Sequence, residues 1–227
     1  MAPGAETEAA SPAAADIVDA VFAISCRALP VDHAYALSQA IGAEMPWFAS
    51  DPRAGMHTIH GAESGAGWMR PEGPDALLQL SHRARLALRL PRERLDDAAA
   101  LVGRTLHVAG WPLRVERLAL RPLSRITTLF SRCVIVDAIE EEAAFLAAAG
   151  AELDSLGIRA ERVLCGRVTQ LATPDRSYQA RSLMLAGLSQ EGSLRLQQVG
   201  LGAGRKLGCG LFIPHKDIAD LRTRVDD

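Results

Sequence analysis

The order of apolar segments repeats along this chain of 227 residues. In the N-terminal half, apolar periodicity predicts a strand, a helix, two strands, a second helix and a closing pair of strands. These elements are expected over residues 18–27, 33–44, 76–80, 85–90, 91–102, and 106–108 with 113–120. Residues 47–75 are rich in Gly, Pro, Ser and Asp, so we interpret them as irregular, apart from a short strand-like piece at 56–59.

The C-terminal half shows the same order of elements. A strand, a helix, a hairpin, a second helix and a last strand are expected over residues 127–136, 140–156, 162–171 with 178–186, 188–199 and 209–214. Two copies of strand–helix–strand–strand–helix–strand predict an α+β protein with two tandem ferredoxin-like (βαββαβ) domains. We place the domains and tails as follows: a disordered tail at 1–15, domains at 16–121 and 126–216 joined near 122–125, and a tail at 217–227.

Composition excludes several classes of protein. The formal net charge is −2, so the whole chain carries no basic signal for nucleic acid. The first 15 residues lack the pattern of a secretory signal, and no apolar run is long enough to span a bilayer. The four cysteines are isolated, which indicates neither a zinc site nor a disulfide framework: Cys26, Cys133, Cys165 and Cys209. We therefore expect a cytoplasmic protein with buried thiols, no metal and no cofactor.

A glycine-rich loop at residues 200–210 is the most distinctive local motif. Five of its eleven residues are glycine, and Arg205 and Lys206 lie near its centre. Backbone N–H groups beside two cations suit phosphate oxygens. A dinucleotide-binding loop follows a strand and opens a helix, whereas this loop follows a predicted helix and enters a strand, which excludes that class. A glycine-rich connection that binds no ligand remains the alternative.

Basic residues gather in the same part of the chain. Between Arg159 and Lys216, nine basic residues stand against three acidic ones, which gives this segment a net charge of +6. A basic C-terminal half on a nearly neutral protein indicates a local site for a polyanion. A solvated charged face would give the same count.

The loop resembles the glycine-rich signature of the RAMP superfamily of CRISPR-associated proteins: Gly-hydrophobic-Gly, five residues including a basic one, then Gly-hydrophobic-Gly. Here the two triplets are residues 200–202 and 208–210. Within the superfamily, residues 17–216 resemble the CRISPR repeat-processing endoribonucleases, with a looser match at 28–37. The resemblance implies a precursor CRISPR RNA that is cut within its repeat. It also implies retention on the crRNA repeat hairpin, as a subunit of a CRISPR interference complex.

The resemblance places the chemistry in the N-terminal domain. In several family members a catalytic histidine stands at the start of the first helix, where this chain has His33. The implied reaction is metal-independent: the ribose 2′-OH attacks the adjacent phosphate and leaves a 2′,3′-cyclic phosphate and a 5′-OH. A helix N-terminus disfavours imidazolium, so we expect His33 to be a neutral base. Tyr35 and His57 are further candidates, and Arg83 or Arg85 would replace the lysine that some relatives use.

Several cations and glycines are expected to contact the RNA backbone: Gly200, Gly202, Gly204, Arg205, Lys206, Gly208, Gly210, Arg167, Arg181 and Lys216. His57 and His60 form an H-x-x-H pair, but on a strand they would face opposite sides and no third ligand is near, so no metal site is predicted. Two alternatives stay open. One is a non-catalytic RNA-binding RAMP subunit of a CRISPR effector complex, and the other is a small-molecule or nucleotide-binding ferredoxin-like regulator.

Overall fold

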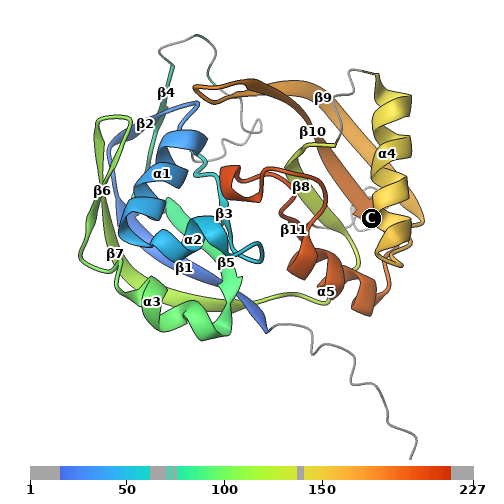
Figure 1. The fold of residues 1–227 in the computed structure, drawn as a ribbon, viewed down its shortest axis with the longest axis horizontal. Coiled ribbons are helices and arrows are strands. Elements are labelled where there is room, and N and C mark those ends of the chain that lie inside the picture. Colours follow the sequence, from blue (N-terminus) through green and yellow to red (C-terminus); the bar gives the residue numbers. More distant parts are fainter. Residues whose placement is uncertain (1–15, 62–70, 72, 74–75, 137–140, 216–227) are drawn as a thin grey trace, which may run out of the picture.

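The computed structural model describes residues 16–61, 71, 73, 76–136 and 141–215. The tails predicted at 1–15 and 217–227 lie outside the described residues, as does Lys216. Within the described chain, no helix is long and apolar enough to cross a membrane. Figure 1 shows two sheets side by side, with the glycine-rich loop and its short turn lying between them.

The N-terminal half forms a five-stranded antiparallel sheet in the order β3-β5-β1-β7-β6. Its strands are β1 (Ile17–Ser25), β3 (Gly55–His57), β5 (Arg85–Pro91), β6 (Thr105–Val108) and β7 (Trp111–Pro122). Its helices are α1 (Ala34–Glu44), α2 (Pro46–Ser50) and α3 (Leu95–Ala99), the last preceded by a 3-10 turn, η1 (Arg92–Arg94). The chain order β1-α1-β3-β5-α3-β7, with these strand neighbours, is ferredoxin-like.

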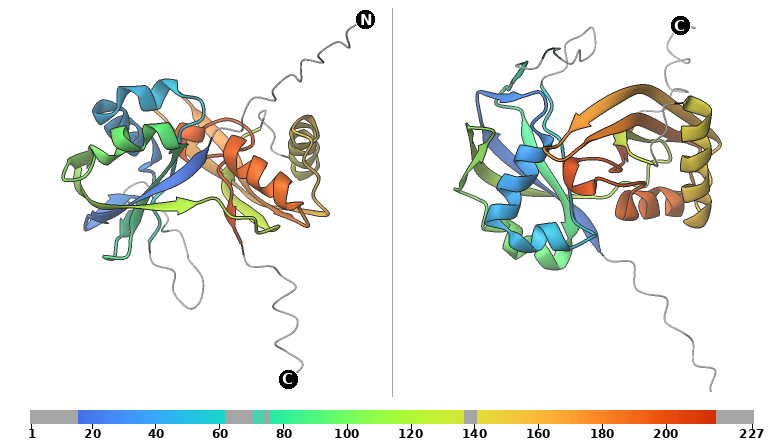
Figure 2. Two further views of the ribbon diagram at one scale, coloured as in Figure 1. Left: turned by 90° about the horizontal axis from the view of Figure 1, so that it is seen from below. Right: turned by 45° about the horizontal axis from the view of Figure 1, so that its top comes forward.

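Alternation in β1 explains how the helices cover this sheet. Phe22 and Ile24 are buried in one apolar cluster with Leu37 and Ile41 of α1. The helices lie together on one side of the sheet (Figures 1 and 2). Asp19 belongs to the alternate set of β1 residues, so it faces the other side of the sheet, where the C-terminal half packs.

The second strand of this domain corrects the interpretation of the sequence. The sequence pattern places residues 76–80 there, but β4 (Leu77–Gln79) instead pairs with β2 (Ala28–Pro30) in a separate two-stranded sheet. The true edge strand is β3, which overlaps the short strand-like piece predicted at 56–59. Its central residue, Met56, is fully buried in the core, so tertiary packing compensates for a strand too short to show a clear period.

The helix predicted at 91–102 is also shorter than expected. Pro91 remains in β5, and the Arg92 N–H donates to the Asp16 carbonyl, which extends the ladder by one residue. At the other end, the Gly103 N–H donates to Val115 of β7 and draws the chain back to the sheet. Backbone pairing at both ends therefore limits the helix to α3.

The C-terminal half forms a four-stranded antiparallel sheet in the order β11-β8-β10-β9. Its strands are β8 (Leu129–Val134), β9 (Arg162–Ala172), β10 (Ser177–Ala186) and β11 (Ile213–Pro214). Its helices are α4 (Glu142–Ser155) and α5 (Gln190–Val199), and the glycine-rich loop contains the 3-10 turn η2 (Arg205–Leu207). Ser189 caps α5 by accepting from the Gly192 N–H at 3.0 Å. The order is again ferredoxin-like, so the predicted fold class is confirmed.

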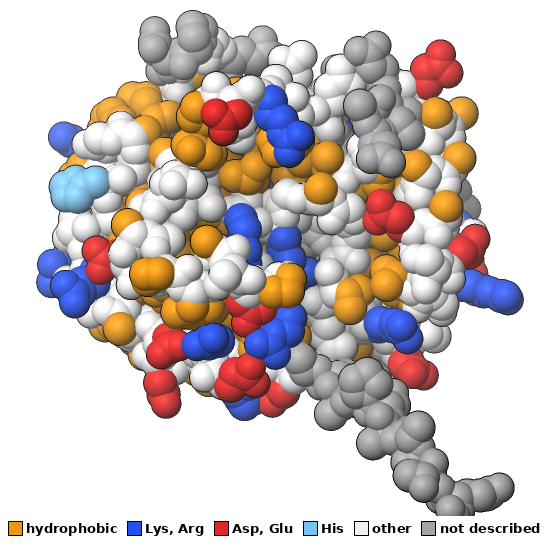
Figure 3. All heavy atoms as spheres, viewed as in Figure 1, with side chains coloured by type: hydrophobic (Ala, Val, Ile, Leu, Met, Phe, Trp, Pro, Cys, Tyr) orange, Lys and Arg blue, Asp and Glu red, His pale blue; other side chains and the backbone are white. Residues whose placement is uncertain are grey.

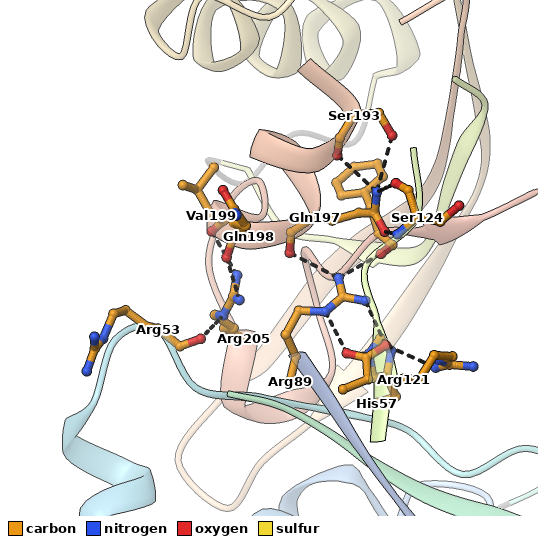
Figure 4. Close-up of polar contacts among 12 residues, drawn as sticks. Arg53, His57, Arg89, Arg121, Ser124, Ser193, Gln197, Gln198, Val199 and Arg205 are labelled. Atoms are coloured by element: carbon orange, nitrogen blue, oxygen red, sulfur yellow. Dashed lines mark hydrogen bonds and ion pairs between the residues drawn. The ribbon is translucent and has the colours of Figure 1, made fainter. Parts of the chain in front are cut away.

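A buried arginine joins the two halves. The Arg89 side chain is 1% exposed, and its Nε donates to Asp19 Oδ1 at 2.8 Å. Its Nη2 donates to Asp19 Oδ2 at 3.1 Å, and its Nη1 donates to the Phe212 carbonyl at 2.7 Å and to the Gln197 carbonyl at 3.1 Å, both in the C-terminal half (Figure 4). Buried charges need such partners, so this contact fixes how the two domains meet.

Two of the four cysteines are joined in a disulfide, which corrects the expectation of isolated thiols. Cys133 of β8 and Cys209 of the glycine-rich loop lie 4.6 Å apart between Cα atoms and are bonded, whereas Cys26 and Cys165 are free. The backbone brings them together, because the Gly210 N–H donates to the Cys133 carbonyl at 2.6 Å. A separation of 76 residues leaves no local sequence signal for this pairing.

Candidate functional site

A cavity of about 310 Å³ lies where the two halves meet. From the N-terminal half its wall includes His33, Ile59 and His60; from the C-terminal half it includes Arg132 and Gln170. The segments that supply these side chains are the start of α1, the stretch after β3, and strands β8 and β9. Polar and titratable groups from two domains therefore converge on one site.

His33 sits at the start of α1, as predicted, and is only 2% exposed. Its Nδ1 lies 2.9 Å from the Pro30 carbonyl oxygen, and the Ile59 N–H donates to its Nε2 at 3.1 Å. A carbonyl only accepts and an N–H only donates, so the proton must be on Nδ1. This arrangement holds the neutral imidazole, with the Nε2 lone pair bonded to the Ile59 N–H.

His60 is the second histidine on the cavity wall, and no sequence pattern pairs it with His33. It is partly exposed, and its Nε2 lies 3.1 Å from the Thr58 hydroxyl oxygen. Thr58 also lines the cavity. The segment 58–60 is held by the Ile59 N–H bond to His33, so the two imidazoles are linked through a single backbone residue.

Arg132 supplies a cation at the same cavity. It lies on β8, with its guanidinium carbon 5.8 Å from the centre of the Phe130 ring. The sequence analysis suggests Arg83 or Arg85 as the replacement for the lysine that some relatives use, but neither arginine lines the cavity. The Arg85 guanidinium instead donates to the carbonyls of His82 and Ala84. A charged residue within an apolar strand is the only sequence signal for Arg132.

Tyr35 does not share the cavity of His33. It lines a neighbouring, more open cavity of about 830 Å³ between α1 and the tip of the β9–β10 hairpin. The other tyrosine of the chain, Tyr178, lines the same cavity, with the Arg176 guanidinium carbon 4.2 Å from its ring centre. Lys206 of the glycine-rich loop lines it as well.

His57 lies in a buried ionic cluster rather than at the His33 cavity. Its Nε2 is 3.6 Å from Asp19 Oδ1, next to Arg89 and Arg121 (Figure 4). Burial lowers the pKa of His57 below its usual value despite the nearby carboxylate. Burial raises the pKa of Asp19, but the nearby His57, together with the charge and hydrogen bonds of Arg89, outweighs that effect and lowers it well below its usual range. A neutral His57 beside ionised Asp19 belongs to the domain junction.

The two loop cations fasten the glycine-rich loop to its surroundings. Arg205 donates to the backbone carbonyls of Arg53, Gln198 and Val199 at 2.8–3.1 Å (Figure 4). Burial lowers its pKa to about 10. One of these carbonyls belongs to the N-terminal domain and two to the end of α5, so the side chain bridges the halves.

Lys206 makes a similar bridge. Its Nζ donates to the Asp51 and Ala54 carbonyls, each at 2.5 Å, and lies 4.6 Å from the centre of the Phe48 ring. Burial, with the neighbouring Arg205 charge, lowers its pKa to about 8. Figure 3 shows Lys and Arg side chains along the middle of this face, where the halves meet.

The loop glycines are required by close backbone packing. A Cβ on Gly202, whose φ is +71°, would lie 2.1 Å from the Ile135 carbonyl oxygen. A Cβ on Gly210, whose φ is +69°, would lie 2.2 Å from the Leu201 carbonyl oxygen. The glycines of the signature are therefore needed for the loop to fold against the end of β8 and against itself, whatever else the loop binds.

Two further predicted RNA contacts, Arg167 and Arg181, belong to the β9–β10 hairpin. Arg181 of β10 is 9% exposed and donates to the Gly166 carbonyl at 3.0 Å, with its guanidinium carbon 5.9 Å from the Phe145 ring centre. Arg167 is in β9, but its side chain lies outside the described residues. Among the described residues, no group of three or more His, Cys, Asp or Glu is arranged to hold a metal ion.

Tandem ferredoxin-like domains, with a glycine-rich loop packed at their junction beside two histidines, define a protein of the RAMP class. A family model described as "Cas6 Crispr" matches residues 18–217. The chain belongs to this family, the Cas6 proteins of CRISPR systems.

Individual relatives agree with this assignment. The chain is 33% identical over 197 residues to the CRISPR-associated endonuclease Cas6 of Myxococcus xanthus (strain DK1622). This match covers 87% of the present chain and 81% of the relative. A solved CRISPR associated protein Cas6 is similar in fold, with a TM-score of 0.61 at 11% identity over 88% of this chain and 99% of that one. The product of a Cas6-related gene from Pyrococcus furiosus gives a TM-score of 0.59 at 12% identity, over the same shares.

Proposed function

We propose that this protein is an endoribonuclease that cleaves precursor CRISPR RNA within the repeat. The 2′-OH would attack the adjacent phosphorus without a metal ion, giving a 2′,3′-cyclic phosphate and a 5′-OH, and the enzyme would stay on the mature crRNA with other subunits of an interference complex. The observation that carries the proposal is the cavity between the domains, with His33 in its wall at the start of α1. Membership of the Cas6 family supplies the substrate class.

His33 is proposed as the general base. The Pro30 carbonyl fixes its Nδ1 proton, which leaves Nε2 as the basic nitrogen. The Ile59 N–H must release Nε2 before a ribose hydroxyl can donate to it. Catalytic hydrogen bonds commonly form only in the substrate complex, so the bond from the Ile59 N–H does not conflict with the role of His33.

The second cavity is proposed as part of the RNA path. Tyr35, Tyr178 and Lys206 line it, and aromatic rings with cations suit unpaired nucleotides. The glycine-rich loop and the hairpin arginines remain our proposed backbone contacts. Replacing Arg205 and Lys206 together should weaken repeat binding and flatten its dependence on salt, measured as the slope of log K against log salt. An unchanged slope would remove both side chains from the RNA interface.

The test of the function is cleavage of the protein's own repeat RNA in EDTA. Wild type should yield cyclic-phosphate and 5′-OH ends, and His33→Ala should abolish cleavage while RNA affinity is retained. His107→Ala serves as the matched control, because His107 is an exposed residue of β6 away from the cavity. Cleavage that survives in His33→Ala would contradict the catalytic assignment.

A non-catalytic RNA-binding RAMP subunit is the second candidate. One observation favours it: both ring nitrogens of His33 are already bonded to backbone groups. In that case wild type binds the repeat RNA with the same affinity as His33→Ala and leaves it uncut.

A further inference from the structure

We propose that His60 is the second proton-transfer residue of this site, the general acid that protonates the leaving 5′-oxygen while His33 takes the 2′ proton. The inference rests on the proposed nuclease function and adds a residue that neither the sequence motif nor the family match points to. It comes from the shape of the cavity, which holds two imidazoles contributed by separate segments.

The reaction requires two proton movements. The 2′-oxygen forms a bond to phosphorus as it loses its proton to the base, and the bond from phosphorus to the 5′-oxygen breaks. That 5′-oxygen leaves as an alkoxide unless an acid protonates it, giving the 5′-OH product. The two histidines then return to their starting protonation by exchange with water, so nothing else is consumed.

His60 is the wall residue whose chemistry fits the acid. Imidazole gains and loses a proton near neutral pH, whereas carboxyl groups are ordinarily ionised there and guanidinium groups ordinarily keep their proton. The charged residues that share the described wall are Asp32 and Arg132, and Cys133 is bonded to Cys209. The other sequence candidates, Tyr35 and His57, lie elsewhere among the described residues.

The local geometry orients His60. The Thr58 hydroxyl lies 3.1 Å from its Nε2, and the intervening Ile59 N–H is bonded to His33 Nε2 at 3.1 Å. When a ribose hydroxyl replaces the Ile59 N–H at His33, that N–H is released beside His60. The base and the acid are thus coupled through one peptide group. Replacing His33 therefore disturbs both, and only a test specific to the leaving group separates them.

The experiment uses two synthetic copies of the repeat RNA from the protein's own array, identical except for sulfur in place of the bridging 5′-oxygen at the mapped cleavage site. A thiolate leaves without protonation, so it removes the need for an acid. On the normal RNA, His60→Ala and His60→Gln should be slower than wild type by about 10²- to 10⁴-fold in single-turnover cleavage. On the sulfur-containing RNA both should come within about tenfold of wild type, because only the acid has been lost.

His33→Ala is the internal comparison, since loss of the base should slow both RNAs. His82→Ala, at an exposed turn residue, should cut both at the wild-type rate. Equal losses on the two RNAs in the His60 variants would show a structural role and overturn the inference, as would normal cleavage of the oxygen RNA. Equilibrium binding of uncut RNA by each variant verifies that the site has kept its fold. A wild type that cuts neither RNA overturns the proposed nuclease function itself, and the role of His60 with it.

Discussion

His33 combines a structural and a chemical role in one side chain. Its imidazole connects the Pro30 carbonyl, which precedes α1 in the chain, to the Ile59 N–H, which follows it. Removing the ring leaves both without that partner, and an unsatisfied buried polar group costs about 1–3 kcal/mol. Cleavage assays on His33 variants therefore need a parallel measurement of unfolding free energy.

Arg132 is the residue we expect to stabilise charge on the phosphate. Arg132→Ala should lower the single-turnover cleavage rate by about 10²- to 10³-fold, because a preorganised donor at a developing anion is lost. Arg132→Lys should recover part of the rate, since it keeps the charge but not the forked geometry. Arg114→Ala, an exposed arginine of β7, is the control. An Arg132→Ala enzyme as fast as this control would place Arg132 outside the reaction.

Lys206 predicts a dependence of stability on pH. Its pKa falls from 10.5 to about 8 in the fold, so between these values the unfolded chain holds a proton that the folded chain has lost. Stability should therefore rise with pH across this window, relative to Lys206→Met. The side chain is only partly buried and screened by solvent, so we expect about 1 kcal/mol. Urea unfolding of wild type and Lys206→Met at pH 7.5 and at pH 10 measures this gain. If the two proteins differ in free energy of unfolding by the same amount at both pH values, the prediction is wrong.

The glycine-rich loop follows α5 and binds to the chain at the end of β8. The Ala203 N–H donates to the Ile135 carbonyl at 2.8 Å, and the Leu201 N–H to the Gly210 carbonyl at 3.1 Å. The Cys133–Cys209 disulfide reinforces the same path. These contacts need close backbone approach, which explains why glycine recurs there.

Gly202→Ala should lower the free energy of unfolding by about 2–3 kcal/mol, because the methyl group meets the Ile135 carbonyl oxygen and the residue holds a left-handed φ. Gly42→Ala is the matched control. Gly42 lies within α1, where an added Cβ would meet no other atom within 4 Å, so its replacement should stabilise the protein by about 0.5–1 kcal/mol. Chemical denaturation of both variants gives the comparison. A neutral Gly202→Ala would mean that the loop relaxes freely.

One buried ionic contact, between Asp19 and Arg89, sets how the two domains are arranged in the molecule. Asp19 receives Arg89 from β5 and Arg121 from β7, while Arg89 also reaches two carbonyls of the C-terminal half. The cavity that holds His33 is made of residues from both halves, so its shape depends on this junction.

Arg89→Met should therefore cost about 3–5 kcal/mol of stability, because Asp19 stays buried after losing its main partner. RNA cleavage should fall with it, even though Arg89 is not a cavity residue. Arg104→Met removes an exposed arginine 3.8 Å from Glu44 and should change stability by less than about 0.5 kcal/mol. Equal stability of the two variants would show that the junction is held by other contacts.

Local patterns in the sequence determined much of the architecture. Period-two alternation in β1 and the Ser189 cap of α5 can be predicted without any structure, because each depends on residues a few positions apart. The repeated order of elements predicted both ferredoxin-like domains, and the loop signature indicated the family. The three-residue strand β3 shows locally only as the short strand-like piece at 56–59, and its place at the sheet edge is set by the packing of Met56 against distant residues.

Only the tertiary structure decided which polar groups meet. Arg205 and Lys206 contact carbonyls more than 150 positions away along the chain, and the 76-residue separation of Cys133 and Cys209 is closed by the loop. His60 joins His33 at one cavity, while Tyr35 and His57 are carried to other places. Periodicity records which face of an element is apolar, but the partner of a side chain is set by how the domains dock.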